Sequence, residues 1–271
     1  MTTPSYSSYF LIDSALLDGS DVAPPTAAKQ RPAWLTPVYD DNAATVSPLV
    51  IDILAAWEAG QLKVLMKLVH ACRPQLHVSI IETAGTVPEL VQHLRQFIYI
   101  NTEDGRQLSL RFADCAVLPA LAGCLNGAQW SALTKPLLSW RVHRRDGTLM
   151  TLPPAREAVL SATPLTLSSA QIDGLLAALG NDHVLRNVLL RRHMRALPGS
   201  ALEQFRRTGA ARLAWHAAGH TDDDPQLLFF ADAVLETAGR LLVAQGLQPV
   251  LEQTDANQIR DGLRRLVAEF D

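Results

Sequence analysis

Residues 86–125, TVPELVQHLRQFIYINTEDGRQLSLRFADCAVLPALAGCL, carry the clearest local signals in the chain. Thr86 and Glu89 have the spacing of a capping box, in which each side chain bonds a free backbone amide at the start of a helix. Apolar residues then recur at helical spacing: Leu90, Val91, Leu94 and Phe97. Residues 98–100 change to β-branched and aromatic types, which strands prefer. The first part of this stretch is therefore predicted to be a helix followed by a strand.

A turn and a second strand are predicted next. The sequence Glu103-Asp104-Gly105 is typical of a hairpin turn, because glycine can adopt a positive φ. Leu108, Leu110 and Phe112 then alternate with polar residues, which is the pattern of a half-buried strand. Asp114 is well placed to cap a following helix. The apolar face of that helix would consist of Val117, Leu118, Leu121 and Leu125.

Residues 92–118, QHLRQFIYINTEDGRQLSLRFADCAVL, resemble the core of the type VI secretion effector adaptors, the Tap/Tec chaperone family. That family has a helix rich in Leu, His and Arg, a strand, a D-G turn, and a strand ending in an R-F-x-D-like tetrad. The tetrad here is Arg111-Phe112-Ala113-Asp114, and Cys115 follows it. The family usually has an aromatic residue at the third position of the tetrad, where this chain has Ala113. It usually has proline after the Asp, where this chain has Cys115. Two further segments, YFLIDSALLDG (9–19) and PAWLTPV (32–38), resemble the family's first two strands. The resemblance covers roughly the N-terminal half.

This resemblance implies an adaptor without catalytic activity or cofactor. Such proteins bind a secreted effector protein in the producing cell and help to load it onto the VgrG spike. Arg111, Phe112 and Asp114 are then candidates for partner binding, in a tetrad that holds a carboxylate of the partner or orders an internal loop. The alternative is structural, because polar residues between a strand and a helix are commonly caps. In that interpretation Asp114 caps a helix and Arg111 forms an ion pair with a neighbouring loop.

Composition and charge argue against two classes of protein, those that bind nucleic acid and those that insert into membranes. The 271 residues are 48% hydrophobic and 19% charged, which predicts a substantial core. A formal net charge of −3 argues against a nucleic-acid-binding protein built on bulk charge. The first 19 residues lack the features of a signal peptide, and charged residues interrupt the apolar run 227–243. We therefore expect no membrane insertion, no nucleic-acid partner and a cytoplasmic protein.

The chain is expected to have two lobes. Residues 1–152 are predicted to form an α/β lobe with a mixed β-sheet, in which a strand over 33–38 lies near an edge because of its prolines. Ser47 is expected to cap a helix running to about Ala59, with Pro48 at its first position. Residues 153–167 are predicted to be a linker, and 168–271 an all-α lobe. The expected helices of this lobe are 168–179, ended by Gly180-Asn181, then 184–197, 201–218, 225–245 and 257–270.

A metal-dependent hydrolase is the alternative function. His216 and His220 are four residues apart, as in helix-borne metal ligands, and the acidic run Asp222–Asp224 follows. However, Gly219 is expected to end the helix before His220, and no glutamate lies between the histidines as in the H-E-x-x-H pattern. Caps of the next helix explain the aspartates better than a metal site does.

Seven arginines crowd the region between residues 186 and 212, where Glu203 is the one acidic residue. They are Arg186, Arg191, Arg192, Arg195, Arg206, Arg207 and Arg212. A solvated helix face is one interpretation. The other is a docking surface for an acidic partner, because arginine is favoured at interfaces. Arg191, Arg192, Arg206 and Arg207 are our candidates for partner binding on this face.

Overall fold

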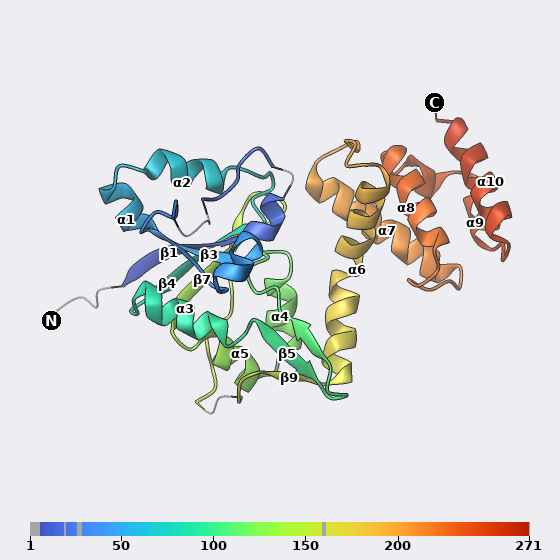
Figure 1. Cartoon of the computed structure of the whole chain (residues 1–271). Coiled ribbons are helices and arrows are strands. Elements are labelled where there is room, and N and C mark those ends of the chain that lie inside the picture. The colour runs from blue at the N-terminus through green and yellow to red at the C-terminus, as the bar shows by residue number, and fades with distance from the viewer. Residues whose placement is uncertain (1–5, 19, 26–28, 159–160, 271) are drawn as a thin grey trace. The chain divides into compact units, whose positions relative to one another are not determined.

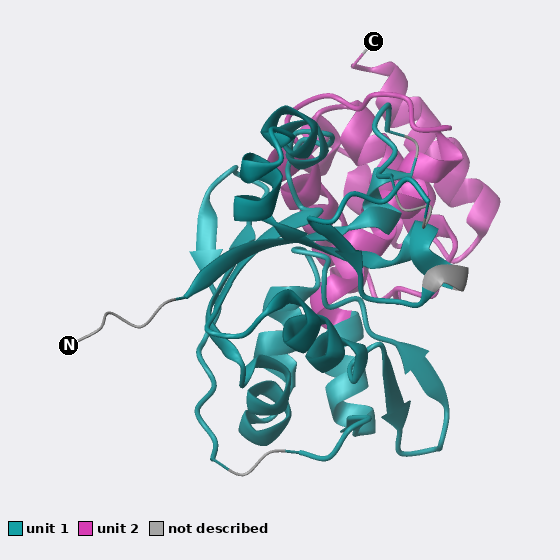
Figure 2. Cartoon of the chain, turned by 60° about the vertical axis from the view of Figure 1, so that its left-hand side comes forward, with its two compact units in different colours: residues 1–176 teal, residues 177–271 magenta. Residues whose placement is uncertain are grey.

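A computed structural model describes residues 6–18, 20–25, 29–158 and 161–270. The chain divides into two units, residues 1–176 and 177–271, shown in different colours in Figure 2. The first unit is built on β-sheets with flanking helices, and the second consists of helices. The predicted fold class, an α/β lobe followed by an all-α lobe, is therefore confirmed.

The first unit contains a six-stranded sheet and a three-stranded sheet. The larger sheet has the order β2-β3-β1-β4-β7-β8, and every neighbouring pair in it is antiparallel. Its strands are β1 (Ser7–Asp13), β2 (Leu35–Pro37), β3 (Pro48–Asp52), β4 (Val78–Thr83), β7 (Leu137–His143) and β8 (Leu149–Thr151). The edge position expected from the prolines of β2 is confirmed.

Parallel and antiparallel pairing are mixed in the smaller sheet. It consists of β5 (Tyr99–Thr102), β6 (Gln107–Ser109) and β9 (Thr166–Leu167), in the order β6-β5-β9. β6 is antiparallel to β5 and β9 is parallel to it. Residues 153–167 were predicted to be a linker, and 159–160 among them lie outside the described residues. The end of this segment forms β9, a strand of the first unit. Leu165 and Leu167 are buried in its core.

Helices cover both faces of the six-stranded sheet, as Figure 1 shows. On one side lie α1 (Ile53–Glu58) and α2 (Leu62–Val69), and on the other α3 (Val87–Arg95), α4 (Leu118–Cys124) and α5 (Gly127–Thr134). Short 3-10 helices, η1 (Ser14–Leu17) and η2 (Asp41–Val46), join the first strands. Neighbouring residues of β1 face opposite sides, because side chains alternate along a strand. Leu11 thus joins the core beneath α3 and α5, and Ile12 joins the core beneath α1 and α2.

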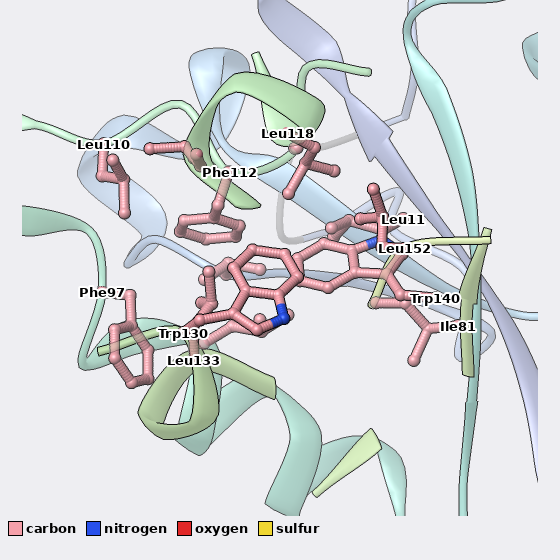
Figure 3. Packing of buried hydrophobic residues seen from close by; sticks show 14 of the residues in the cluster. Leu11, Ile81, Phe97, Leu110, Phe112, Leu118, Trp130, Leu133, Trp140 and Leu152 are labelled. Atoms are coloured by element: carbon pink, nitrogen blue, oxygen red, sulfur yellow. The ribbon is translucent and has the colours of Figure 1, made fainter. Parts of the chain in front are cut away.

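Two tryptophans stand at the centre of the larger core, beside Phe112 (Figure 3). The indole N–H of Trp140 donates to Ser79 Oγ at 2.9 Å, and that of Trp130 donates to the Pro153 carbonyl at 2.9 Å. Buried tryptophans need such an acceptor, because an unpaired indole N–H would lose its hydration without compensation. The second of these bonds holds Pro153, the first residue of the predicted linker, to α5.

The helix predicted from Ser47 to Ala59 is wrong over its first half. Residues Pro48–Asp52 form the central strand β3, and four of the five are fully or almost fully buried. The apolar run Leu49-Val50-Ile51 pairs with β1 and β2, so tertiary pairing overrides the helix-start signal of Ser-Pro. The true helix start is Asp52, whose side chain accepts from the Ala55 amide at 2.9 Å.

The half-buried strand predicted over 108–112 is also wrong in part. β6 ends at Ser109, and all three of its residues are exposed. Leu108 has 39% of its surface exposed, whereas Leu110 and Phe112 are buried. The chain leaves the small sheet after Ser109, so the alternation in sequence spans a strand and the turn that follows it. The preceding capping box at Thr86 and the positive φ of Gly105 are confirmed.

The second unit consists of the end of α6 (Ser169–Arg191), α7 (Ala201–Ala217), α8 (Gln226–Glu236), η3 (Arg240–Val243), α9 (Leu247–Leu251) and α10 (Ala256–Ala268). Three expected boundaries are wrong. The helix expected to run to Leu197 ends at Arg191, because His193 and Met194 adopt positive φ. Gly180-Asn181 does not end a helix, because α6 continues through both residues. The helix expected over 225–245 stops at Glu236, since Ala238 and Gly239 both adopt positive φ.

Candidate partner-binding surfaces

Arg111 lies at the junction between the small sheet and the turn before α4, where it meets two carboxylates. Its Nη2 donates to Asp13 Oδ2 at 2.7 Å and lies 3.4 Å from Asp114 Oδ2. The side chain of Arg111 is 37% exposed, whereas those of Asp13 and Asp114 are 6% and 10% exposed. The two carboxylates are therefore largely removed from water, and the guanidinium stands between them and solvent.

Each carboxylate also holds a backbone amide. Asp13 Oδ1 accepts from the Ala15 amide at 3.0 Å, and Asp114 Oδ1 accepts from the Ala116 amide at 2.9 Å. Asp13 thereby caps η1, and Asp114 holds the turn that leads into α4. The structural interpretation of the tetrad is close to this arrangement, although Asp114 caps a turn and Val117 is the N-cap residue of α4. The ion cluster fastens the end of β1 to the tetrad.

The two neighbouring carboxylates keep Arg111 charged. Burial lowers the pKa of Arg111, but the neighbouring carboxylates of Asp13 and Asp114 outweigh it, and the net pKa is raised. The guanidinium of Arg111 is partly exposed to solvent. Phe112 has no exposed surface and packs with Trp130 and Leu118 (Figure 3), so a partner can reach Arg111 but not the Phe112 ring in this structure.

His77 is a buried polar residue close to this cluster that our sequence analysis did not single out. Its side chain is 1% exposed, and Nε2 donates to the Leu68 carbonyl at 2.9 Å. Nδ1 has no hydrogen-bond partner among the described residues. Burial lowers the pKa of His77, so the neutral ring is favoured. The sequence around it, Gln75-Leu76-His77-Val78, offers no signal of this role.

The arginines of the second unit separate into two groups. Arg192 bonds Asp232 and lies 2.9 Å from Glu236, Arg207 donates to the Pro198 carbonyl at 2.8 Å, and Arg212 bonds Asp222 and Asn181. Their side chains are between 12% and 20% exposed, and they hold the unit together. Arg186, Arg195 and Arg206 are exposed and have no ion-pair partner among the described residues.

Of the four arginines that we proposed for partner binding, Arg206 thus points into solvent and Arg192 and Arg207 have internal partners. Arg191 is exposed, and its guanidinium carbon lies 3.9 Å from the ring centroid of Phe229. It forms a cation–π contact, which leaves its charge available to a partner.

His216 and His220 have separate partners. His216 Nε2 lies 2.9 Å from Asp222 Oδ1, a carboxylate whose pKa is lowered chiefly by its bond to Arg212. His220 stacks on Trp215 with ring centroids 4.0 Å apart, and its Nε2 donates to the Leu251 carbonyl at 2.6 Å. The helix ends at Ala217, before Gly219, as expected. Within the described ranges, no three His, Cys, Asp or Glu side chains are grouped to hold a metal ion.

No helix in the described part of the chain has the length and apolar character needed to cross a membrane. Exposed apolar side chains gather on α1 and α2, where Leu54 and Trp57 are 60% and 63% exposed.

Comparison with known proteins gives one match. Residues 9–132 match the model of a family described as a domain of unknown function (DUF4123). No curated protein and no solved structure matches the chain. The matched region contains most of β1, all of β2 to β6 and of α1 to α4, and most of α5.

Proposed function

We propose that the chain is a cytoplasmic adaptor without catalytic activity, which binds a type VI secretion effector and helps to load it onto the VgrG spike. One observation carries the proposal. Residues 92–118, which resemble the core of the effector adaptors, lie wholly within the region that matches the DUF4123 family model. The tetrad Arg111–Asp114 belongs to this region, and Arg111 is bonded to Asp13 at the end of β1.

The exposed face of α1 and α2 supports a chaperone role for the first unit. Leu54 and Trp57 lie one turn apart on α1, and Leu62, at the start of α2, is 39% exposed. Such a face loses apolar hydration when it covers an apolar segment of another protein, and it shields that segment from aggregation. We propose that this α1–α2 face contacts the effector.

The histidines of the second unit support a structural role. His220 is engaged by an aromatic stack and a backbone carbonyl, and His216 by Asp222. We therefore expect no stoichiometric zinc or iron in the protein after mild purification. Elemental analysis tests this, and metal that is lost in His216→Ala would favour the hydrolase alternative.

Co-purification from the organism that encodes the chain tests the adaptor function. A tagged chain should retain one secreted effector and VgrG, both identified by mass spectrometry. Deleting the gene should abolish export of that effector while other cargo of the apparatus is still exported. Recovery of neither protein, together with unchanged export after deletion, would overturn the proposal.

The α1–α2 face can be tested in the same assay. Leu54→Ser combined with Trp57→Ser should weaken retention of the effector without lowering the melting temperature, because both side chains are mostly exposed. Leu213→Ser is the matched control, since Leu213 is 72% exposed on α7 in the other unit. Equal retention by the double variant and the control would place the effector contact elsewhere.

A further inference from the structure

The second unit contains a small hollow between α8 and α10. It has a volume of about 230 Å³ and a floor of Phe229, Ala233, Leu263 and Val267. Small-molecule sites commonly measure roughly 300–1,000 Å³, so this hollow is better matched to one large apolar side chain than to a ligand. Ala268, an exposed residue near the end of α10, forms part of its rim.

The ring of Phe229 is held by two guanidinium groups. The guanidinium carbon of Arg191, on α6, lies 3.9 Å from the ring centroid, and that of Arg260, on α10, lies 4.3 Å from it. Arg260 Nε also donates to Gln226 Oε1 at 2.7 Å. These contacts fix two positive charges beside the hollow at little further entropic cost, because the arginine side chains are already ordered.

The charges around the hollow are unbalanced. Its two carboxylates, Asp232 and Glu236, are both bonded by Arg192. By contrast, neither Arg191 nor Arg260 has an ion-pair partner in the described part of the chain. Arg264 pairs with Asp261 at 3.1 Å, but both side chains are more than 60% exposed, and such pairs exchange readily with another carboxylate. Arg260 and Arg264, which line the hollow, and Arg191, which contacts Phe229, are therefore available to negative charge.

We propose that this hollow docks an acidic amphipathic segment of a partner protein. One large apolar side chain of the segment enters between α8 and α10, and its flanking carboxylates pair with Arg260, Arg264 and Arg191. An apolar anchor in a pocket with a charged rim is the arrangement found at binding hot spots. The proposal goes beyond the adaptor function, because it concerns the chemistry of the docked segment and holds whichever protein supplies it.

A displayed library of random 16-residue peptides, selected on the full chain, tests the proposal. The recovered peptides should share a Leu, Phe or Trp flanked by Asp or Glu. The dissociation constant of a consensus peptide is then measured by fluorescence anisotropy against variants of the full chain. Ala268→Trp should fill the hollow and weaken binding at least tenfold. Arg264→Glu should weaken binding several-fold and reduce its dependence on salt concentration.

Arg265→Glu is the matched control, because Arg265 is also exposed on α10 but lies outside this hollow. It should leave the dissociation constant unchanged. The melting temperature of each variant is compared with that of the parent, and Arg264→Glu alone decides the outcome if Ala268→Trp is less stable. The proposal is overturned if no peptide with an acidic apolar consensus is recovered, or if its binding is equal in the Arg264→Glu and Arg265→Glu variants.

Discussion

Arg111 donates a hydrogen bond to the carboxylate of Asp13 at 2.7 Å, although 98 residues separate them in the chain. The bond connects the end of β1 to the turn before α4. Asp114 completes the cluster from the other side of the guanidinium. Since both carboxylates are nearly buried, their charges depend on Arg111 for compensation.

Arg111→Met should lower the free energy of unfolding by about 2 kcal/mol, because it removes the guanidinium that compensates two nearly buried carboxylates. The value is below that of a fully buried pair, since Arg111 is partly exposed. Urea denaturation measures the change. Arg106→Met is the matched control: its pair with Asp104 is exposed, and its loss should leave the free energy of unfolding nearly unchanged. Equal effects of the two substitutions would contradict a structural role for the tetrad.

His77 should make the protein sensitive to mild acid. Its pKa is lowered in the folded state by burial, so the unfolded chain takes up the proton first as the pH falls. The stability contributed by neutral His77 is fully present above the pKa that His77 has in the unfolded chain, about 6.5. It is lost as the pH falls toward the lower pKa that His77 has in the folded protein. His93 acts in the same direction, because its pKa is also lowered by burial.

The measurement is the free energy of unfolding between pH 7 and pH 5. His77→Gln should flatten its decline, since glutamine does not titrate and retains a donor for the Leu68 carbonyl. The control is His183→Gln, because His183 is exposed on α6. An unchanged pH slope in His77→Gln would show that His77 does not drive the acid response.

Local signals in the sequence were reliable where the interaction is itself local. The capping box of Thr86 with Glu89 forms as predicted, because its partners are three residues apart. The same signal at Ser200 and Glu203, which starts α7, was present but not used. The two-lobed fold class followed from patterns of this kind.

Signals that depend on distant partners were not accessible from the sequence. Ser47-Pro48 has a helix-start pattern, yet Pro48–Asp52 is a strand because β1 and β2 flank it. The bond between Arg111 and Asp13 also joins segments far apart in the chain. The same is true of the hollow beside Phe229, which is lined by residues of α8 and α10. The arginine cluster was visible, but which members have internal partners depends on the packing of α6, α7 and α8.

Gly180 lies inside α6, where the side chain of Arg212 leaves no space for a Cβ atom. A Cβ atom there would overlap the guanidinium of Arg212, which donates to Asn181 Oδ1 at 2.6 Å. Gly180→Ala should therefore fail to give the stabilisation of about 0.5–1 kcal/mol that replacing a helical glycine usually gives. In Gly123→Ala, where the Cβ meets nothing within 4 Å, the full gain is expected.

A double-mutant cycle checks this explanation by thermal or urea denaturation. In an Arg212→Ala background the obstacle is gone, and Gly180→Ala should then stabilise the protein as much as Gly123→Ala does. Additive effects of Gly180→Ala and Arg212→Ala would rule out the proposed overlap as the cause.

The exposed arginines Arg186, Arg195 and Arg206 should contribute to association with an acidic partner. Because they have no ion pairs among the described residues, replacing all three by serine should change the free energy of unfolding by less than about 1 kcal/mol. If they face a complementary acidic surface, the association rate constant for the effector or for VgrG should fall. Its dependence on salt should also become weaker, because attraction between exposed charges is screened over about 8 Å at physiological ionic strength.

Surface plasmon resonance against each partner, at several salt concentrations, separates the possibilities. Arg192→Ser is the contrasting variant: it removes bonds to Asp232 and Glu236 and should lower the melting temperature. A loss of association toward only one partner identifies the partner that this face serves. If the triple variant keeps both association rate constants and both salt slopes, the exposed arginines only solvate their helices, and recognition must depend on the hollow between α8 and α10 or on the first unit.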